Sequence, residues 1–322
     1  MTPVSDDVQE AVRALRAGGL IGLPTETVYG LGADASNELA VRRIFAVKGR
    51  PSNHPLIVHL ASVAVARRWA AGWPDEADAL AAAFWPGPLT LILERSPLAS
   101  DAVTGGQDTV GLRVPDHPLA LELLRTFDGG VAAPSANRFG RVSPTTAQHV
   151  RDELGADVEV VLDGGPCRVG VESTIVDLSG RAPRLLRPGG VAREAVERVL
   201  GRPVPLASQA TDVRAPGMLA SHYAPRAGLW LVTAEALAGE VSSRLASGAK
   251  VAVLAARGVP VPAGVTRFEV EDEDAAYARA LYATLREVDA RGLDVVLAVP
   301  PPESGVGLAV VDRLRRASAP RA

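Results

Sequence analysis

The sequence is poor in several residue types, and each shortage argues against a class of protein. Cys167 is the single cysteine among 322 residues, so no intramolecular disulfide can form, which suits a reducing compartment. Aromatic residues make up 4% of the chain, and the 34 basic residues do not outnumber the 37 acidic ones. Because proteins that grip nucleic acid through its phosphates are usually basic, we expect no tight direct binding to nucleic acid.

Long apolar runs and several familiar motifs are also missing. No run reaches the roughly 20 residues that cross a bilayer, and the acidic first ten residues lack the pattern of a signal peptide. We therefore expect a cytoplasmic protein without membrane contact. No Walker A motif, strand-GxGxxG-helix fingerprint, nucleophile elbow or zinc-type His/Cys spacing occurs. The sequence thus predicts no metal site built from protein ligands.

The chain does contain a regular alternation of strand and helix patterns, in two blocks. In the first block, short apolar runs predict strands at residues 20–23, 56–60, 89–93, 110–114, 130–133, 158–162, 174–178 and 184–186. In the second block, strands are predicted at residues 229–232, 251–254, 267–270 and 295–299, alternating with helices. Residues 201–226 contain four prolines and no amphipathic period, which is typical of a linker.

This pattern predicts an α/β fold with two domains. An N-terminal α/β domain is expected over residues 1–204, a linker over 205–227, and a small C-terminal α/β domain with mainly parallel strands over 228–322.

Polar segments that lie beside predicted strands are the candidate binding residues, since ligands tend to bind at strand ends in open α/β sheets. They cover residues 24–32, 48–55, 108–115 and 133–145. Lys48 and Arg50, two residues apart, are suited to a triphosphate, although cations are also favourable at any helix C-terminus. Residues 133–145 combine hydroxyls, an amide and backbone N–H groups before a helix, as a phosphate cradle or an ordinary N-cap does.

Three single residues leave alternatives open. Arg113 lies within an apolar strand, and a buried guanidinium needs a carboxylate partner from the protein or from a substrate. His59 alternates along a strand and either points into a pocket or fills part of the core. Cys167 has no nearby His in the sequence, which favours a small residue in a turn over a nucleophile.

Taken together, the polar segments resemble the YrdC-like family, and within it the threonylcarbamoyl-AMP synthases. The resemblance rests on PTETVYGLG (24–32), KGRP (48–51), PLIVH (55–59), TVGLRVP (109–115), APSAN (133–137), SPT (143–145), ESTIVDL (172–178) and LLRPG (185–189). The C-terminal domain of the longer members is resembled by GMLASHYAPR (217–226), YARALYATLREVDARG (277–292) and GVGLAVVDRLRRA (305–317).

The resemblance implies a twisted open YrdC-like α/β sheet with a large, positively lined cavity, followed by a linker and a Rossmann-like C-terminal domain. In that cavity, L-threonine, bicarbonate and ATP would be condensed to threonylcarbamoyl-AMP and diphosphate, with Mg²⁺ carried by ATP. The product would serve a separate transferase complex that modifies adenosine 37 of tRNA.

The same resemblance implies which residues bind the two larger substrates. L-threonine is expected to contact Thr27, His59, Arg113, Ala133 and Ser173. ATP is expected to contact Lys48, Arg50, His54, Thr109, Ser135, Asn137, Ser143, Arg187 and Tyr223. Two other functions suit the same fold: a carbamoyltransferase that uses a carbamoyl adenylate, and a non-enzymatic RNA-binding module. A requirement for L-threonine in ATP consumption would separate the first from a synthase.

Overall fold

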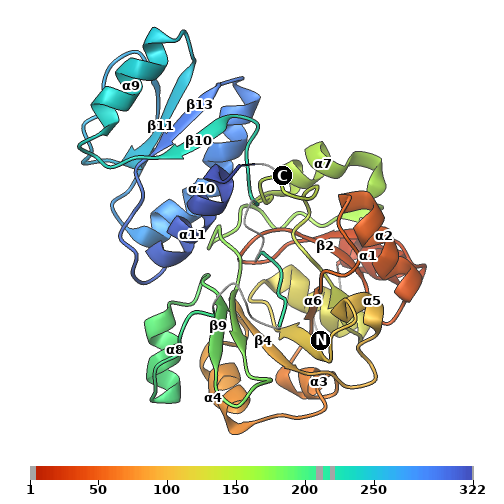
Figure 1. Ribbon diagram of the computed structural model, residues 1–322. Coiled ribbons are helices and arrows are strands. Elements are labelled where there is room, and N and C mark those ends of the chain that lie inside the picture. The colour runs from red at the N-terminus through yellow and green to blue at the C-terminus, as the bar shows by residue number, and fades with distance from the viewer. Residues whose placement is uncertain (1–4, 208–212, 218–221, 321–322) are drawn as a thin grey trace.

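The computed structural model describes residues 5–207, 213–217 and 222–320. These residues form a nine-stranded sheet and a four-stranded sheet, each with its own helices. Figure 1 shows the smaller sheet, with its helices, above the larger one. The predicted fold class, a twisted α/β sheet followed by a small α/β domain with parallel strands, is confirmed.

The larger sheet has the strand order β7-β1-β2-β6-β3-β5-β4-β8-β9 and mixes parallel with antiparallel pairs. Its strands are β1 Ile21–Leu23, β2 Gly30–Asp34, β3 Ile57–His59, β4 Leu89–Glu94, β5 Thr109–Arg113, β6 Val131–Ala132, β7 Val160–Val161, β8 Thr174–Asp177 and β9 Arg184–Arg187. Its helices are α1 Asp6–Arg16, α2 Glu38–Lys48, α3 Val63–Arg67, α4 Asp75–Phe84, α5 Asp101–Thr104, α6 Pro118–Phe127, α7 Ala147–Leu154 and α8 Arg193–Leu200, with a 3₁₀ turn at Gly155–Asp157.

Local sequence explains where α2 begins and ends. The Asn37 side chain accepts hydrogen bonds from the N–H groups of Leu39 and Ala40, which caps the helix start. Gly49 ends the helix in the left-handed region, with φ of 63°, a conformation that glycine adopts without steric cost. Lys48 is therefore the last residue of the helix, and Arg50 begins the turn that follows.

Strand register brings distant site residues together. Strands β3 and β5 pair in parallel with His59 opposite Arg113, so both residues end their strands at the same edge of the sheet. Strands β8 and β9 pair antiparallel, which sets Arg187, the last residue of β9, beside Ile175 near the start of β8.

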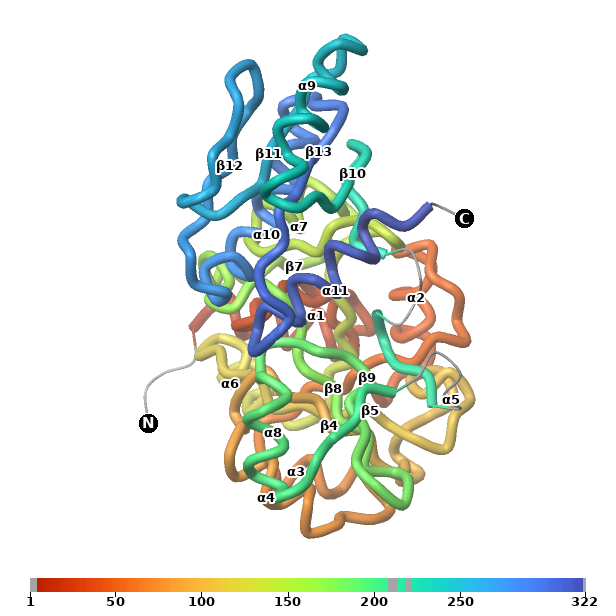
Figure 2. The backbone as a smooth tube through the Cα atoms, turned by 60° about the vertical axis from the view of Figure 1, so that its left-hand side comes forward, coloured from red at the N-terminus to blue at the C-terminus, as the bar shows by residue number. Residues whose placement is uncertain are grey.

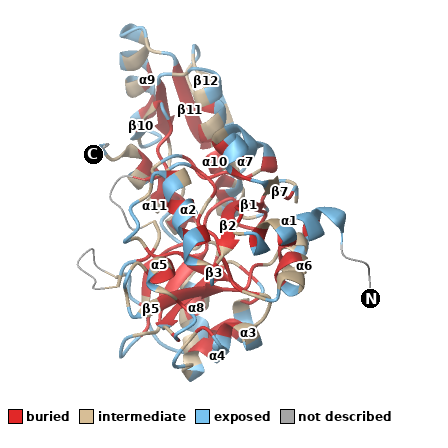
Figure 3. Cartoon of the chain, turned by 90° about the vertical axis from the view of Figure 1, so that its right-hand side faces the viewer, coloured by how far each residue is buried: buried red, intermediate tan, exposed pale blue. Residues whose placement is uncertain are grey.

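The smaller sheet is entirely parallel, in the order β10-β13-β11-β12. It consists of β10 Gly228–Leu231, β11 Val251–Ala256, β12 Thr266–Val270 and β13 Val295–Ala298, with helices α9 Leu237–Ala246, α10 Asp274–Ala290 and α11 Gly307–Ser318. Figures 1 and 2 show α10 and α11 on the side of this sheet that faces the larger domain. Figure 3 shows that the strands of both sheets are mostly buried, while α9 on the outer side is largely exposed.

The two domains share an apolar core. One cluster of buried side chains combines Val28, Val142 and Val171 of the larger domain with Leu281 and Leu314 of α10 and α11. Gly170 lies so close to α10 that an added Cβ would be 2.4 Å from Arg279 Cα. The C-terminal domain is therefore packed directly against the larger domain.

The predicted strands coincide with strands of the structure, apart from small differences at their ends, but two elements of the structure are additional. Strand β2 and the short helix α5 were not predicted, and both are short segments without a clear apolar period. Within the predicted linker, residues 205–207 run beside β9, where Leu185 N–H donates to Pro205 O and Ala207 N–H donates to Leu185 O, both at 2.9 Å. The predicted linker residues 208–212 and 218–221 lie outside the described residues. No helix in the described part of the chain is long and apolar enough to cross a membrane.

Candidate active site

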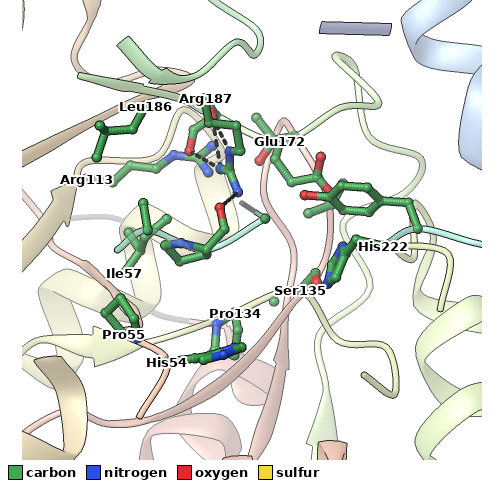
Figure 4. Close-up of a pocket in the computed structure, with 18 of the residues that line it drawn as sticks. His54, Pro55, Ile57, Arg113, Pro134, Ser135, Glu172, Leu186, Arg187 and His222 are labelled. Carbon is green, nitrogen blue, oxygen red and sulfur yellow. Dashed lines mark hydrogen bonds between the residues drawn. The ribbon is translucent and has the colours of Figure 1, made fainter. Parts of the chain in front are cut away.

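A cavity of about 470 Å³ lies between the larger sheet, the segment that follows α8, and helix α11. Figure 4 shows Arg113, Leu186 and Arg187 along one wall, with His54 and Pro55 along the opposite one. Most residues predicted to bind substrate line this cavity: Thr27, Lys48, Arg50, His54, His59, Arg113, Ala133, Ser135, Ser173, Arg187 and Tyr223. The segments on which the sequence prediction rests therefore meet in one place.

At one end of the cavity, Arg113 is paired with a carboxylate of the protein. Its Nη2 lies 2.8 Å from Glu26 Oε1, and the two side chains are only 5% and 2% exposed. The alternative left open by the sequence is thus answered in part, because Glu26 supplies a carboxylate partner while Arg113 still lines the cavity. Burial, reinforced by the charge of Arg113, lowers the pKa of neighbouring His59 to about 3, so its imidazole is neutral near pH 7.

Hydroxyl groups surround the same end. Thr25 Oγ1 and Thr27 Oγ1 are 2.8 Å apart, and Ser173 Oγ lies 2.8 Å from Thr90 Oγ1. The combination of a guanidinium, a neutral imidazole and hydroxyls suits a small polar ligand with a carboxylate group. The residues that the family resemblance implies for L-threonine lie at this end of the cavity, and we call it the threonine end.

At the other end, three cations lie near one another: Lys48 and Arg187 are buried, and Arg50 is half-buried. Lys48 Nζ donates to the carbonyl oxygens of Ser135 and Asn137. Arg50 Nη2 donates to Pro55 O at 2.9 Å, and Arg187 Nη1 donates to Pro216 O at 2.9 Å. Within the part of the chain that the structure describes, none of the three cations forms an ion pair.

Burial is the main reason why these cations are less basic than usual. It lowers the pKa of Lys48 well below its ordinary value, with a further decrease from the charge of Arg50. It lowers the pKa of Arg50 to about 10 and also lowers that of Arg187. Desolvated cations whose hydrogen-bond partners are neutral groups have the electrostatic character of an anion site, and we call this part of the cavity the nucleotide end.

Three residues predicted to bind ATP do not line the cavity. Thr109 begins β5 and pairs with Glu94. Asn137 lies behind the wall, where its Nδ2 donates to Arg138 O at 2.8 Å. Ser143 is fully buried, and its Oγ donates to Glu172 Oε1 at 2.7 Å. Their assignment to ATP remains a prediction.

Several residues that line the cavity are not assigned to a substrate from the sequence. Glu172 and His222 line it next to the predicted Ser173 and Tyr223, and Asp312 and Arg316 reach it from α11. Glu172 and His222 stand next to residues that the resemblance implies in binding, whereas no residue of the motif that contains Asp312 and Arg316 is implied in binding. That motif, VVDRLRRA, looks like the charged face of an ordinary amphipathic helix, so nothing local distinguishes it from a solvated surface.

The thiol of Cys167 and the possibility of a metal site also bear on the chemistry. Burial raises the pKa of the Cys167 thiol to about 12, so this residue stays protonated near pH 7 and is a poor nucleophile. Among the described residues, no group of three or more His, Cys, Asp or Glu side chains is arranged to hold a metal ion.

Known proteins resemble both domains. The family model for Sua5, YciO and YrdC, described as telomere recombination, matches residues 13–189, and the model for the threonylcarbamoyl-AMP synthase C-terminal domain matches residues 191–319. The threonylcarbamoyl-AMP synthase of Pyrococcus abyssi is 42% identical over 97% of this chain and 94% of its own length. That of Bacillus subtilis is 40% identical over 98% of this chain and 93% of its own.

A solved structure matches as well. The crystal structure of P. abyssi Sua5 complexed with L-threonine has a TM-score of 0.92 to this chain at 42% sequence identity, covering 97% of this chain and 94% of that one. The agreement extends over both domains. The chain therefore belongs to the Sua5/YrdC family, in the two-domain form that ends in the C-terminal domain of threonylcarbamoyl-AMP synthases.

Proposed function

We propose that this chain is a threonylcarbamoyl-AMP synthase that condenses L-threonine, bicarbonate and ATP into threonylcarbamoyl-AMP, diphosphate and water. The observation that carries the proposal is the charge distribution of one cavity. A paired arginine among hydroxyls lies at one end, and three buried or half-buried cations, which form no ion pair among the described residues, lie at the other. An amino acid and a nucleoside triphosphate are the ligands that suit these two ends.

The proposed reaction needs no nucleophile from the protein. The threonine amine attacks the carbon of bicarbonate, and loss of water leaves a carbamate. A carbamate oxygen then attacks the α-phosphorus of ATP, and the bond from that phosphorus to the bridging oxygen of the β-phosphate breaks, which releases diphosphate. The site has to position three substrates and to offset negative charge at phosphorus. The protonated state of Cys167 agrees with this absence of covalent catalysis.

The residue roles follow from the two ends of the cavity. Arg113, Thr27, His59, Ser173 and the backbone of Ala133 are proposed to hold L-threonine. Lys48, Arg50 and Arg187 are proposed to neutralise the triphosphate, with His54, Ser135 and Tyr223 against the nucleotide. Mg²⁺ is proposed to arrive on the phosphates of ATP, because the cations and hydroxyl donors of the nucleotide end suit phosphate oxygens, and no cluster of three or more His, Cys, Asp or Glu side chains among the described residues is arranged to hold a metal ion.

The wider setting is also a proposal. Threonylcarbamoyl-AMP is an activated mixed anhydride, so a transferase has to consume it, and we propose that this transferase modifies adenosine 37 of tRNA. The balance of 34 basic and 37 acidic residues supports a chain that does not itself grip tRNA tightly. The lone buried Cys167 supports a cytoplasmic location.

Release of diphosphate tests the proposed function. Wild-type protein is incubated with ATP, Mg²⁺ and bicarbonate, with and without L-threonine, and diphosphate is measured along with the adenylate product by mass spectrometry. Release that requires L-threonine and yields threonylcarbamoyl-AMP is the expected result. Release that ignores L-threonine would indicate a different acceptor on the same fold. No release under any condition would contradict the enzyme assignment and leave the RNA-binding alternative to be tested.

A further inference from the structure

Arg313 of α11 is the largest side chain in the described part of the chain that is almost completely buried. Burying a guanidinium is costly unless its N–H groups find partners. Arg313 Nε lies 2.7 Å from Glu172 Oε2, and Nη2 donates to Pro188 O at 3.0 Å. Nη1 lies 2.5 Å from Asp312 Oδ2. This arginine of the C-terminal domain thus grips two residues of the larger domain.

Glu172 receives hydrogen bonds from three directions. Besides Arg313, Ser143 Oγ donates to it at 2.7 Å from the larger domain, and Tyr282 OH donates at 2.9 Å from α10. Burial alone would raise the pKa of this carboxyl, but the charges of Arg313 and Arg187 and the hydrogen bonds outweigh it and lower the pKa to about 2. Glu172 is therefore ionised near pH 7, as is its partner, and the contact is a charged one.

The positions of the two gripped residues give the contact its consequence. Glu172 directly precedes Ser173, the residue before β8, and Pro188 directly follows Arg187, the last residue of β9. Ser173 and Arg187 both line the cavity and are bonded to each other, with Arg187 Nη2 donating to Ser173 O at 2.9 Å and to Ser173 Oγ at 3.1 Å. The Arg313 guanidinium therefore binds the chain neighbour of Ser173, at the threonine end, and the chain neighbour of Arg187, at the nucleotide end.

Arg313 also touches the nucleotide end from behind. Its guanidinium carbon lies 5.2 Å from the ring centre of Tyr223, which lines the cavity. The same ring packs against His222 at 4.1 Å and Tyr282 at 5.7 Å between centroids. The position of Tyr223, which has a φ of 63°, is thus fixed partly by side chains of the C-terminal domain.

We propose that Arg313, a residue of the C-terminal domain, is a positioning residue of the active site. Its contacts hold Ser173, Arg187 and Tyr223 in the positions that bind the substrates. The C-terminal domain is then part of the catalytic apparatus and not an independent appendage. The inference rests on the proposed function, because it concerns how that cavity binds threonine and ATP together.

Arg313→Lys is the test variant, since lysine keeps the charge but cannot hold Glu172 and Pro188 at once as the guanidinium fork does. Arg315→Ala on the same helix is the matched control, because Arg315 is 57% exposed and pairs only with Glu303 among the described residues. The KM values for L-threonine and for ATP, kcat and the melting temperature are measured for each protein. Expected for Arg313→Lys is a rise of roughly tenfold or more in both KM values, with values for Arg315→Ala within about twofold of wild type.

The outcomes separate positioning from simple domain adhesion. If Arg313 only stabilises the interface between the domains, Arg313→Lys has a lower melting temperature but wild-type KM values at temperatures where it is folded. That result would overturn the proposal. Should Arg313→Lys not fold, Glu172→Gln/Arg313→Met replaces the buried ion pair by neutral groups, and wild-type KM values in that protein would equally overturn it. Should wild type make no threonylcarbamoyl-AMP, the proposed function fails independently. Calorimetric binding of L-threonine and of a non-hydrolysable ATP analogue then decides the role of Arg313, since unchanged dissociation constants reject it.

Discussion

The two ends of the cavity hold their cations in different ways. At the threonine end, Arg113 is paired with Glu26 inside the protein, so the pair adds no net charge. At the nucleotide end, Lys48, Arg50 and Arg187 donate hydrogen bonds to carbonyl oxygens. Among the described residues, no carboxylate oxygen lies within 4 Å of their charged nitrogen atoms. A neutral pair matches a zwitterion whose own charges cancel, whereas buried cations with neutral partners match a polyanion.

This difference also indicates where stability and function conflict. The charges of the buried Arg113–Glu26 pair cancel each other, so removal of one partner affects folding as well as binding. The cations of the nucleotide end form no ion pair among the described residues, and desolvation lowers their pKa and makes them costly for the free protein. Their retention is explained by a ligand that supplies the missing negative charge.

The largest effect is expected at the threonine end. Arg113→Ala removes the proposed partner of the threonine carboxylate, so kcat/KM for L-threonine should fall roughly 100-fold, which corresponds to about 2.7 kcal/mol. The KM for ATP should change less than about threefold, because Arg113 is not expected to contact the nucleotide. Initial rates of diphosphate release over a matrix of threonine and ATP concentrations measure both constants.

A stability control accompanies this variant. Arg113→Ala leaves Glu26 buried without its partner, at a cost of about 3–5 kcal/mol in the free energy of unfolding. Glu26→Gln/Arg113→Met removes both charges and should regain most of that stability in urea denaturation without regaining threonine binding. If either protein kept the wild-type KM for L-threonine, Arg113 would serve only as the partner of Glu26.

The next largest effect is expected at the nucleotide end. Lys48→Met keeps the apolar stem but removes the charge, so the KM for ATP should rise roughly tenfold while the KM for L-threonine stays nearly constant. The chain has one other lysine, Lys250, which is exposed, and Lys250→Met is a matched control that should behave as wild type. Equal increases in both KM values would show that the two ends are not separable in this way.

A smaller effect concerns one histidine at each end. Burial lowers the pKa of His59 and of His222 to about 3, below the ordinary value of 6.5. The unfolded chain therefore binds more protons than the folded one between these values, so stability is complete above pH 6.5 and declines as pH falls toward 3. Each histidine should contribute up to about 1.4 kcal/mol per pH unit of decline.

Urea unfolding at pH 7, 6 and 5 measures this dependence in a range where few carboxyl groups titrate. His59→Gln should show a shallower decline than wild type over the same range, and His222→Gln should do the same independently. A wild-type free energy of unfolding that does not change between pH 7 and pH 5 would contradict neutral burial of both imidazoles.

Local sequence accounts for most elements but not for the contacts between them. Helix α1 could be predicted because Val8, Ala11, Val12 and Leu15 form one apolar stripe, and all four are buried. Strand β2 could not, because GLGAD is short, rich in glycine and buried at nearly every position, without alternation. The order of strands follows from tertiary packing, which a local pattern does not contain.

The same limit applies to the site. The polar segments beside strands marked the residues that line the cavity, since strand ends gather ligands in such sheets. The partner of Arg113 was missed although Glu26 lies within one of those segments, because 87 residues separate them. The bond from Arg313 to Glu172 spans 141 residues and joins two domains. Only the folded chain shows that a charged helix face completes the cavity.

The smallest effect is expected at a residue that the resemblance assigns to ATP but that lies outside the cavity. Thr109 is expected from resemblance to bind ATP, but it begins β5 opposite Glu94 and does not line the cavity. Ser135 is a hydroxyl residue that does line it. A side chain outside the cavity makes no contact with ATP that its removal could abolish, so Thr109→Ala should change the KM for ATP less than about twofold. Ser135→Ala removes a hydroxyl group inside the cavity and should raise the KM for ATP by roughly three- to tenfold. The reverse order would mean that ATP binding draws the start of β5 into the nucleotide end, so that the cavity of the free protein is not the one that acts.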